Sequence, residues 1–194
     1  MTTPVHMVLA LSPEGMSDYK ERRSRGKYRF GMRRRDVAAL RKRLKELGFR
    51  PGKVELHEVP SRRMHAARKQ IETRYFLTLA RERAKRMVDW HTKVLVITDI
   101  DMFSSRTKYV VGQGDVDGRA AVVSIARLGS GDDERYLRRV VTEVVHELGH
   151  TLGLRHCRDR DCVMYSSTKL PDSDIKSVQL CERCKIKVGR ALRP

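Results

Sequence analysis

Apolar residues in the first half of the chain alternate between short runs and helical spacing. Val5–Leu11 is a short apolar run that predicts a strand, and Lys53–Val59 has an extended pattern that ends at Pro60. Val94–Thr98 is continuous and β-branched, which suits a central strand buried on both faces. These segments predict three strands of one sheet.

Two segments between these strands have apolar residues at three- and four-residue steps. Arg35–Leu47 predicts a helix closed by Gly48, and Ser61–Met87 predicts a long helix. The stretch Ser12–Gly15 predicts a turn after the first strand. The first half therefore alternates strand and helix, as α/β proteins do.

The second half begins with a pattern typical of a hairpin. Tyr109–Val111 and Ala120–Ile125 predict two strands joined by the turn-rich segment Gly112–Gly118. A hairpin after the last βα unit makes the sheet mixed. We therefore expect an α/β fold with a mixed, mostly parallel sheet.

The length of 194 residues suits a single compact domain, 1–194. Within it we expect an N-terminal lobe, 1–153, with the sheet and the active-site helix, and a C-terminal lobe, 154–194. No apolar run approaches the roughly 18 residues of a membrane span. The apolar run Met7–Leu11 has no basic leader and no cysteine precedes Cys157, so we expect a cytoplasmic protein without membrane contact. We also expect a monomer.

The net charge of +18 is concentrated in residues 1–93, which hold 25 of the 42 Lys and Arg residues. Such an excess is typical either of a patch that binds nucleic acid or acidic peptides, or of a solvated arginine-rich surface without a dedicated partner. We favour the solvated surface, because no nucleic-acid motif accompanies the charges.

The run H-E-L-G-H-T-L-G-L-R-H at residues 146–156 carries the clearest chemistry. On a helix, His146 and His150 lie one turn apart on the same face and can bind one zinc ion, with Glu147 beside them as a general base. Gly153 can end the helix in a left-handed conformation. The chain can then return His156 as a third ligand, which leaves the fourth position of a tetrahedral zinc to water.

A structural interpretation of the same run has three histidines hydrogen-bonded in a core and Glu147 on the surface. The specified glycine and third histidine favour zinc over this interpretation. Apolar residues upstream form one helical stripe that His146 and His150 lie beside, as residues facing a cleft do. The stripe consists of Val141, Val144, Val145, Leu148 and Leu152.

All four cysteines follow the histidine run, as the close pairs Cys157/Cys162 and Cys181/Cys184. This pattern is typical of a tetrahedral four-cysteine zinc site, which can hold together a segment too polar to fold around an apolar core. Two disulfides are the alternative, and the expected cytoplasmic setting disfavours them. The sequence thus predicts two zinc ions, one catalytic and one structural.

The combined motif resembles the archaemetzincin branch of the metzincin metallopeptidases. The resemblance rests on H-E-L-G-H-T-L-G-L-R-H-C, Cys162, Val163-Met164 and the late C-x-x-C, with support from Val94–Phe103 and Ala121–Leu128. It implies His146, His150 and His156 as catalytic zinc ligands and Glu147 as the base. It further implies Met164 as an apolar floor, the four cysteines around a structural zinc, and Ala121–Ala126 as the antiparallel edge strand that pairs with a peptide.

The expected activity is zinc-dependent hydrolysis of a peptide bond, and the resemblance implies short peptides and sometimes aminopeptidase-like action. The alternative is a non-catalytic zinc protein that binds nucleic acid through its basic half. Glu147 argues against the alternative, because a purely structural three-histidine site has no need of it.

Overall fold

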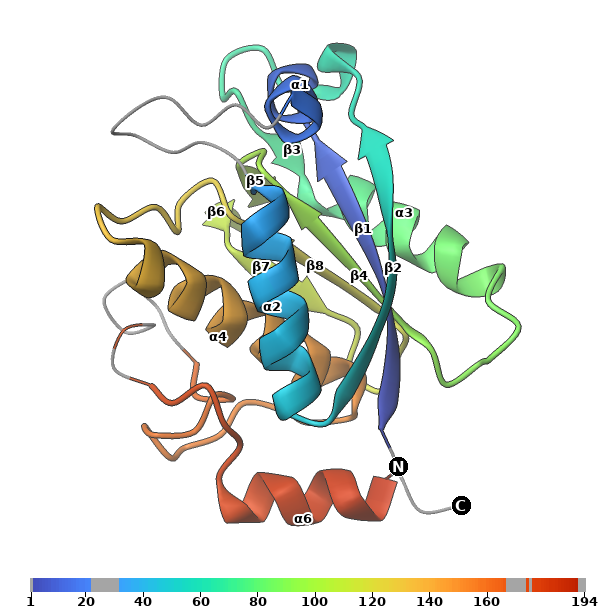
Figure 1. Ribbon diagram of the computed structural model, residues 1–194, viewed down its shortest axis with the longest axis vertical. Coiled ribbons are helices and arrows are strands. Elements are labelled where there is room, and N and C mark those ends of the chain that lie inside the picture. The colour runs from blue at the N-terminus through green and yellow to red at the C-terminus, as the bar shows by residue number, and fades with distance from the viewer. Residues whose placement is uncertain (1, 22–31, 167–173, 175, 192–194) are drawn as a thin grey trace.

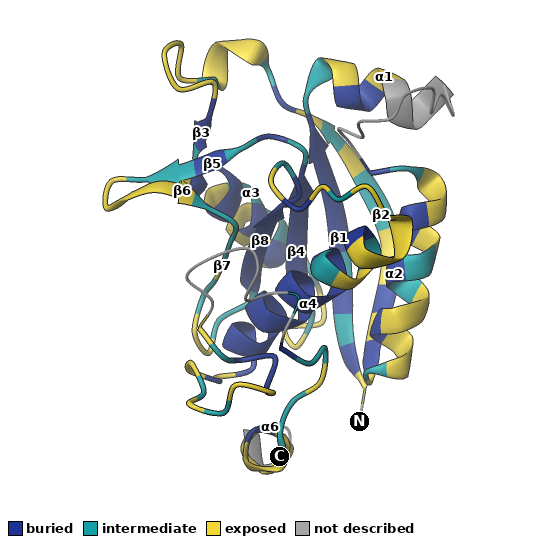
Figure 2. Cartoon of the chain, turned by 90° about the vertical axis from the view of Figure 1, so that its left-hand side faces the viewer, coloured by how far each residue is buried: buried dark blue, intermediate teal, exposed yellow. Residues whose placement is uncertain are grey.

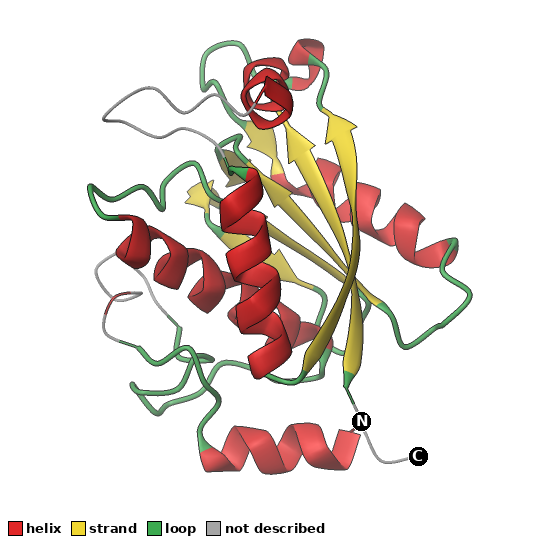
Figure 3. Cartoon of the chain, in the orientation of Figure 1, coloured by secondary structure: helices red, strands yellow, loops and turns green. Residues whose placement is uncertain are grey.

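A five-stranded sheet runs through the molecule, with α2 and α4 on one face and α3 on the other (Figures 1 and 3). This architecture comes from a computed structural model, which describes residues 2–21, 32–166, 174 and 176–191. The elements in chain order are β1 (Thr3–Leu11), α1 (Pro13–Glu21), α2 (Arg34–Glu46), β2 (Phe49–Glu58), a 3-10 turn (Ser61–Arg63), β3 (Ile71–Glu72), α3 (Thr73–Lys85), β4 (Lys93–Thr98), β5 (Met102–Ser104), β6 (Thr107–Val110), β7 (Gly112–Gly114), β8 (Ala120–Ser124), α4 (Asp133–Thr151) and α6 (Glu182–Ala191).

The large sheet has the strand order β2-β1-β4-β8-β7. Its first four strands are parallel, and β7 alone pairs antiparallel, along the edge of β8. A second, small sheet has the order β3-β5-β6. The predicted α/β fold with a mixed, mostly parallel sheet is therefore confirmed.

Alternation along β1 gives each face of the sheet its own core. Met7 and Leu9 face α2 and α4, whereas Val8 and Ala10 face α3. All of β4 from Val94 onward is buried, as its continuous apolar run predicts. In Figure 2 the middle of the sheet is accordingly dark blue while the outer side of α2 is exposed. The helix α4, which carries the histidine run, is thus fixed against the larger core.

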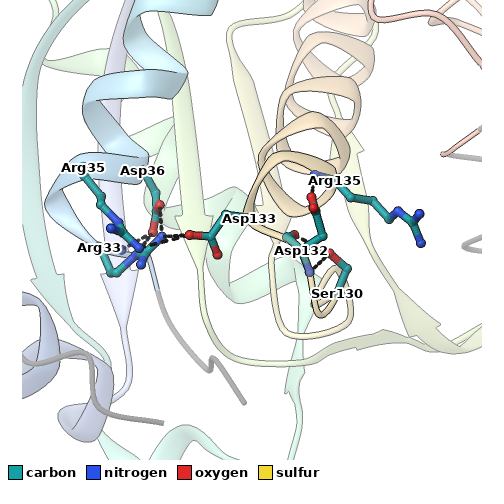
Figure 4. Close-up of polar contacts among 7 residues, drawn as sticks. All are labelled: Arg33, Arg35, Asp36, Ser130, Asp132, Asp133 and Arg135. Carbon is teal, nitrogen blue, oxygen red and sulfur yellow. Dashed lines mark hydrogen bonds and ion pairs between the residues drawn. The ribbon is translucent and has the colours of Figure 1, made fainter. Parts of the chain in front are cut away.

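The N-termini of α2 and α4 are tied together beside the sheet (Figure 4). The Arg33 guanidinium donates to Asp36 at 2.8 Å and to Asp133 at 3.2 Å. Asp132 caps α4 by accepting a 2.6 Å hydrogen bond from the backbone N–H of Arg135. These contacts fix where α4 starts, and hence where its far end lies.

Two predicted elements are wrong in the first half. Ser12–Gly15 starts α1 instead of a turn, because the Ser12 hydroxyl accepts from Gly15 N–H and Pro13 suits a first helical position. The long helix predicted for Ser61–Met87 begins only at Thr73. Its apolar residue Ile71 is buried by pairing with β5 instead.

The hairpin prediction is wrong in its register. Tyr109 belongs to β6, which pairs with β5, and the segment read as a turn contains β7. Ala121–Ala126 is therefore not the edge strand, because β8 lies between β4 and β7. The antiparallel edge is Gly112–Gly114, whose glycines mimic the composition of a turn.

Among the described residues, no helix is long and apolar enough to cross a membrane. The division of the chain into lobes 1–153 and 154–194 stays a prediction.

Candidate metal centre

The last two turns of α4 present His146 and His150 with their ring orientations fixed. Each Nδ1 lies 2.7 Å from a backbone carbonyl oxygen, of Val163 for His146 and of Leu154 for His150. A carbonyl can only accept, so Nδ1 carries the proton and Nε2 keeps its lone pair for a metal. Hydrogen bonding of the non-ligating nitrogen is usual for histidines that bind zinc.

A turn at Gly153 brings His156 back to the two helical histidines. Gly153 has φ of +82°, and its N–H donates to the carbonyl of His150 at 2.9 Å. The ligand atoms of the three histidines lie within 4.8 Å of one another. The predicted helix end and the predicted return of the third histidine are both confirmed.

The histidines are held in the neutral form that a metal requires. Burial, assisted by nearby positive charge, lowers the pKa of His146 to about 3. Burial also lowers the pKa values of His150 and His156. The donor set of three neutral imidazoles with an open fourth position therefore fits a catalytic zinc ion.

Glu147 is buried, not on the surface, so the structural interpretation of the motif is wrong on this point. The edge strand β7 passes directly over it, since a Cβ added at Gly112 would lie 2.5 Å from Oε1 of Glu147. A Cβ at Gly114 would lie 2.4 Å from the backbone oxygen of the same residue. Burial, followed by the charge of Glu143, raises the pKa of Glu147 well above its usual range.

Gly112 and Gly114 are the site residues that sequence reasoning missed. The signal was present in G-Q-G, because glycines two apart in a strand leave one face without side chains. The turn that follows β7 is also attached to the helix, since Asp117 N–H donates to the carbonyl of His150 at 2.9 Å. The approach of its glycines to Glu147 and the hydrogen bond from the following turn to His150 make β7 part of the site.

Met164 packs against α4 at Gly149, whereas the glycines of β7 approach the same helix at Glu147. It is fully buried, and a Cβ added at Gly149 would lie 2.4 Å from its Sδ. The preceding residue, Val163, supplies the carbonyl that orients His146. The segment around Met164 thus supports the histidines through apolar packing and one backbone hydrogen bond.

The four cysteines, all within the described part of the chain, are free thiols gathered in one cluster. Their Sγ atoms lie within 4.8 Å of one another, and Cys157 and Cys181 are 3.8 Å apart. A tetrahedron with zinc–sulfur bonds of about 2.3 Å has edges of about 3.8 Å, whereas a disulfide bond is about 2.05 Å long. The cluster fits a zinc ion and not two disulfides.

The comparisons with known proteins agree with this geometry. The model of peptidase family M54 matches residues 43–190. The chain belongs to peptidase family M54, the archaemetzincins. It is similar to the archaemetzincin of Methanopyrus kandleri, with 38% identity over 142 residues that cover 73% of this chain and 81% of that protein.

Solved structures of M54 peptidases extend the similarity to the whole fold. The crystal structure of the Methanopyrus kandleri archaemetzincin has 35% identity and a TM-score of 0.73, and covers 97% of both chains. The structure of the Archaeoglobus fulgidus archaemetzincin complexed with malonate has 26% identity and a TM-score of 0.67, over 95% of this chain and 99% of that one. This M54 chain is therefore a zinc metallopeptidase, with a histidine cluster and a four-cysteine cluster that suit two zinc ions.

Proposed function

We propose that this M54 peptidase hydrolyses short peptides, with zinc bound by His146, His150 and His156 and with Glu147 as general base. One observation carries the proposal. The carboxyl group of Glu147 lies under the edge strand β7, on the same helical turns as two neutral histidines whose Nε2 atoms are available. The contact of Glu147 with β7 and its place on the helix of two of the histidines support its role as the acid–base group.

The residues of the chain have separable tasks in this reaction. A bound zinc ion supplies Lewis acidity and makes the attacking water more acidic. Glu147 accepts the proton of that water and later gives it to the leaving amine. Burial beneath β7 excludes bulk water from the carboxyl group, so the proton stays between Glu147 and the reacting groups.

The edge strand supports the choice of substrate. Among the described residues no strand pairs with the outer edge of β7, so this edge can offer backbone groups to an extended peptide, as in other cases of strand addition. Only three residues form β7, so few such hydrogen bonds are available and a short peptide suffices to make them. Peptides with free and with acetylated N-termini will separate aminopeptidase from endopeptidase action.

The four cysteines Cys157, Cys162, Cys181 and Cys184 are proposed to bind the structural zinc. Cys157 directly follows His156, and its N–H donates to the carbonyl of Met164 at 2.8 Å. A zinc ion at the cysteines would therefore also hold the third histidine and the methionine turn in place.

The decisive test is Glu147→Gln, which keeps the shape of the side chain and removes the base. We expect this variant to bind two zinc ions and to lose peptide hydrolysis by a factor of about 10²–10⁴. Zinc quantification and peptide-library cleavage, run beside the wild type, measure both. Undiminished cleavage by the variant would refute the role of Glu147.

The nucleic-acid alternative gains no support from the described residues. Several arginines of the basic half already have acidic partners, such as Arg81 with Asp115 at 2.7 Å and Arg83 with Glu55 at 2.6 Å. Such pairs reduce the positive field that a phosphate backbone would meet. Binding of nucleic acid stays an untested alternative, for which a steep fall of affinity with salt is the signature.

A further inference from the structure

Lys176, in the segment between Met164 and α6, is a buried lysine. Its side chain is 1% exposed, and its Nζ lies 3.4 Å from Oε1 of Glu143 on α4, whose side chain is 9% exposed. A buried ion pair contributes little net stability, because the loss of hydration offsets the attraction between the charges. The place of this pair in the molecule is therefore a better guide to its role than its strength.

The pair lies next to the proposed catalytic residues. Glu143 is one helical turn before Glu147 on α4. His146 follows Glu143 by three residues and His150 follows it by seven, so both lie on the same face of α4 as Glu143. The ammonium group of Lys176, paired with Glu143, therefore lies beside the face of α4 that carries these two histidines and Glu147.

The position of this ammonium group is built into the fold. Asp174, two residues before it, accepts two hydrogen bonds from Arg139 of α4, at 2.7 and 2.6 Å. Arg138 donates to the carbonyl of Lys176 at 3.2 Å, and Ser177 N–H donates to the carbonyl of Asp161 at 3.0 Å. Asp174 and Ser177, the described residues that flank Lys176, are therefore both held by hydrogen bonds to other parts of the chain.

We propose that Lys176 is a positioning residue of the hydrolytic site, whose fixed buried charge weakens zinc binding at the histidines and favours the negative charge that develops during hydrolysis. This inference rests on the proposed function. A fixed cation repels a divalent metal ion and attracts a developing anion, and both effects are strong where water is excluded. Glu143 balances the lysine and limits both effects.

The test is the zinc affinity of the histidine site, measured by chelator competition with the four-cysteine site kept loaded. Lys176→Met removes the charge and keeps a similar side-chain volume. We expect the zinc dissociation constant to fall on the order of tenfold, and kcat to fall by a similar factor with less change in KM. A merely structural lysine would give the opposite sign, because a distorted site binds zinc more weakly.

Three further variants keep the test interpretable. Glu143→Gln leaves the lysine unbalanced, so zinc binding should weaken. The double variant Lys176→Met/Glu143→Gln has no unpaired buried charge, folds if the single variant does not, and should bind zinc at least as tightly as the wild type. The matched control Arg139→Gln loosens the same segment but keeps the charge, so it should not tighten zinc binding.

Two outcomes would overturn the inference. In the first, Lys176→Met folds without tightening zinc binding, or the double variant binds zinc more weakly than the wild type. In the second, Arg139→Gln reproduces the tightening. A wild-type protein that binds zinc only at the cysteines would instead refute the proposed function, so the two failures are distinguishable.

Discussion

The histidine cluster and the cysteine cluster are adjacent in the chain but are held in place by different forces. Two of the histidines lie on α4, whose apolar residues Val144 and Leu148 are buried in the larger core, and backbone carbonyls orient both rings. The helix α6, which begins just after Cys181, is mostly exposed (Figure 2). The core positions the helical histidines. Cys162 and Cys184 are buried in the same core, but α6 adds little apolar surface to it, so we expect a metal at the cysteines to hold this segment.

The first prediction tests this difference between the two clusters with the variant Cys184→Ser. Loss of one thiolate should release the structural zinc and lower the melting temperature on the order of 10 °C, because metal binding and folding of this segment are coupled. Because His156 directly precedes Cys157, loss of the structural zinc should also displace His156 and remove most of the peptidase activity. Calorimetry with zinc quantification measures both changes.

The matched variant for the other cluster is His150→Ala, which should lose the catalytic zinc and all hydrolysis but lower the melting temperature much less. Equal thermal losses in the two variants would contradict the comparison. Full zinc occupancy and activity in Cys184→Ser would show that the cysteine cluster does not support the third histidine.

The second prediction concerns the glycine contact above the histidine cluster. Gly112→Ala places a methyl group 2.5 Å from Oε1 of Glu147, closer than van der Waals contact allows, so the carboxyl group must move. We expect a cost of about 1–3 kcal/mol in the free energy of unfolding and a fall in kcat of at least tenfold. Gly129→Ala is the control, because no atom lies within 4 Å of its added Cβ. Similar kcat values in the two variants would show that β7 does not position the base.

The third and smallest prediction is a pH dependence of stability in protein without zinc at the histidines. The pKa of His146 is about 3 in the folded state, against about 6.5 when unfolded, so the unfolded chain binds the proton first. The contribution of His146 to the free energy of unfolding is therefore present above pH 6.5 and is lost as the pH falls toward 3. Between pH 7 and pH 5 the free energy of unfolding should fall by about 2 kcal/mol.

Urea unfolding at the two pH values checks this expectation. The variant His146→Gln carries no titrating ring at this position. Its free energy of unfolding should therefore fall less between pH 7 and pH 5, by about the 2 kcal/mol assigned to His146. An identical pH dependence in both proteins would mean that His146 is not held neutral by the fold.

The sequence predicted the metal chemistry better than the sheet. His146, His150, His156 and the cysteines have ligand spacings that the chain geometry nearly dictates, and the structure brings each set together. The strand β4 was equally predictable, because a short continuous run of β-branched residues is typical of a buried strand.

The missed features depend on tertiary contacts. The composition of Gly112–Gly114 is that of a turn, and only the approach of Glu147 explains why glycine is needed in a strand there. Ile71 has helical spacing to its neighbours, but pairing with β5 buries it in another way. Lys176 gives no signal at all, since a lone lysine in a polar segment is ordinarily a surface residue.

The glycines of β7 also restrict which substitutions the proposed substrate site of this chain can accept. Side chains at 112 and 114 would collide with α4, so this face of the strand accepts no side chain unless α4 or Glu147 moves. Gln113 points the other way and is exposed, and it is free to vary. If β7 binds the peptide backbone as proposed, we expect changes of substrate preference at Gln113 or in the loops around the strand.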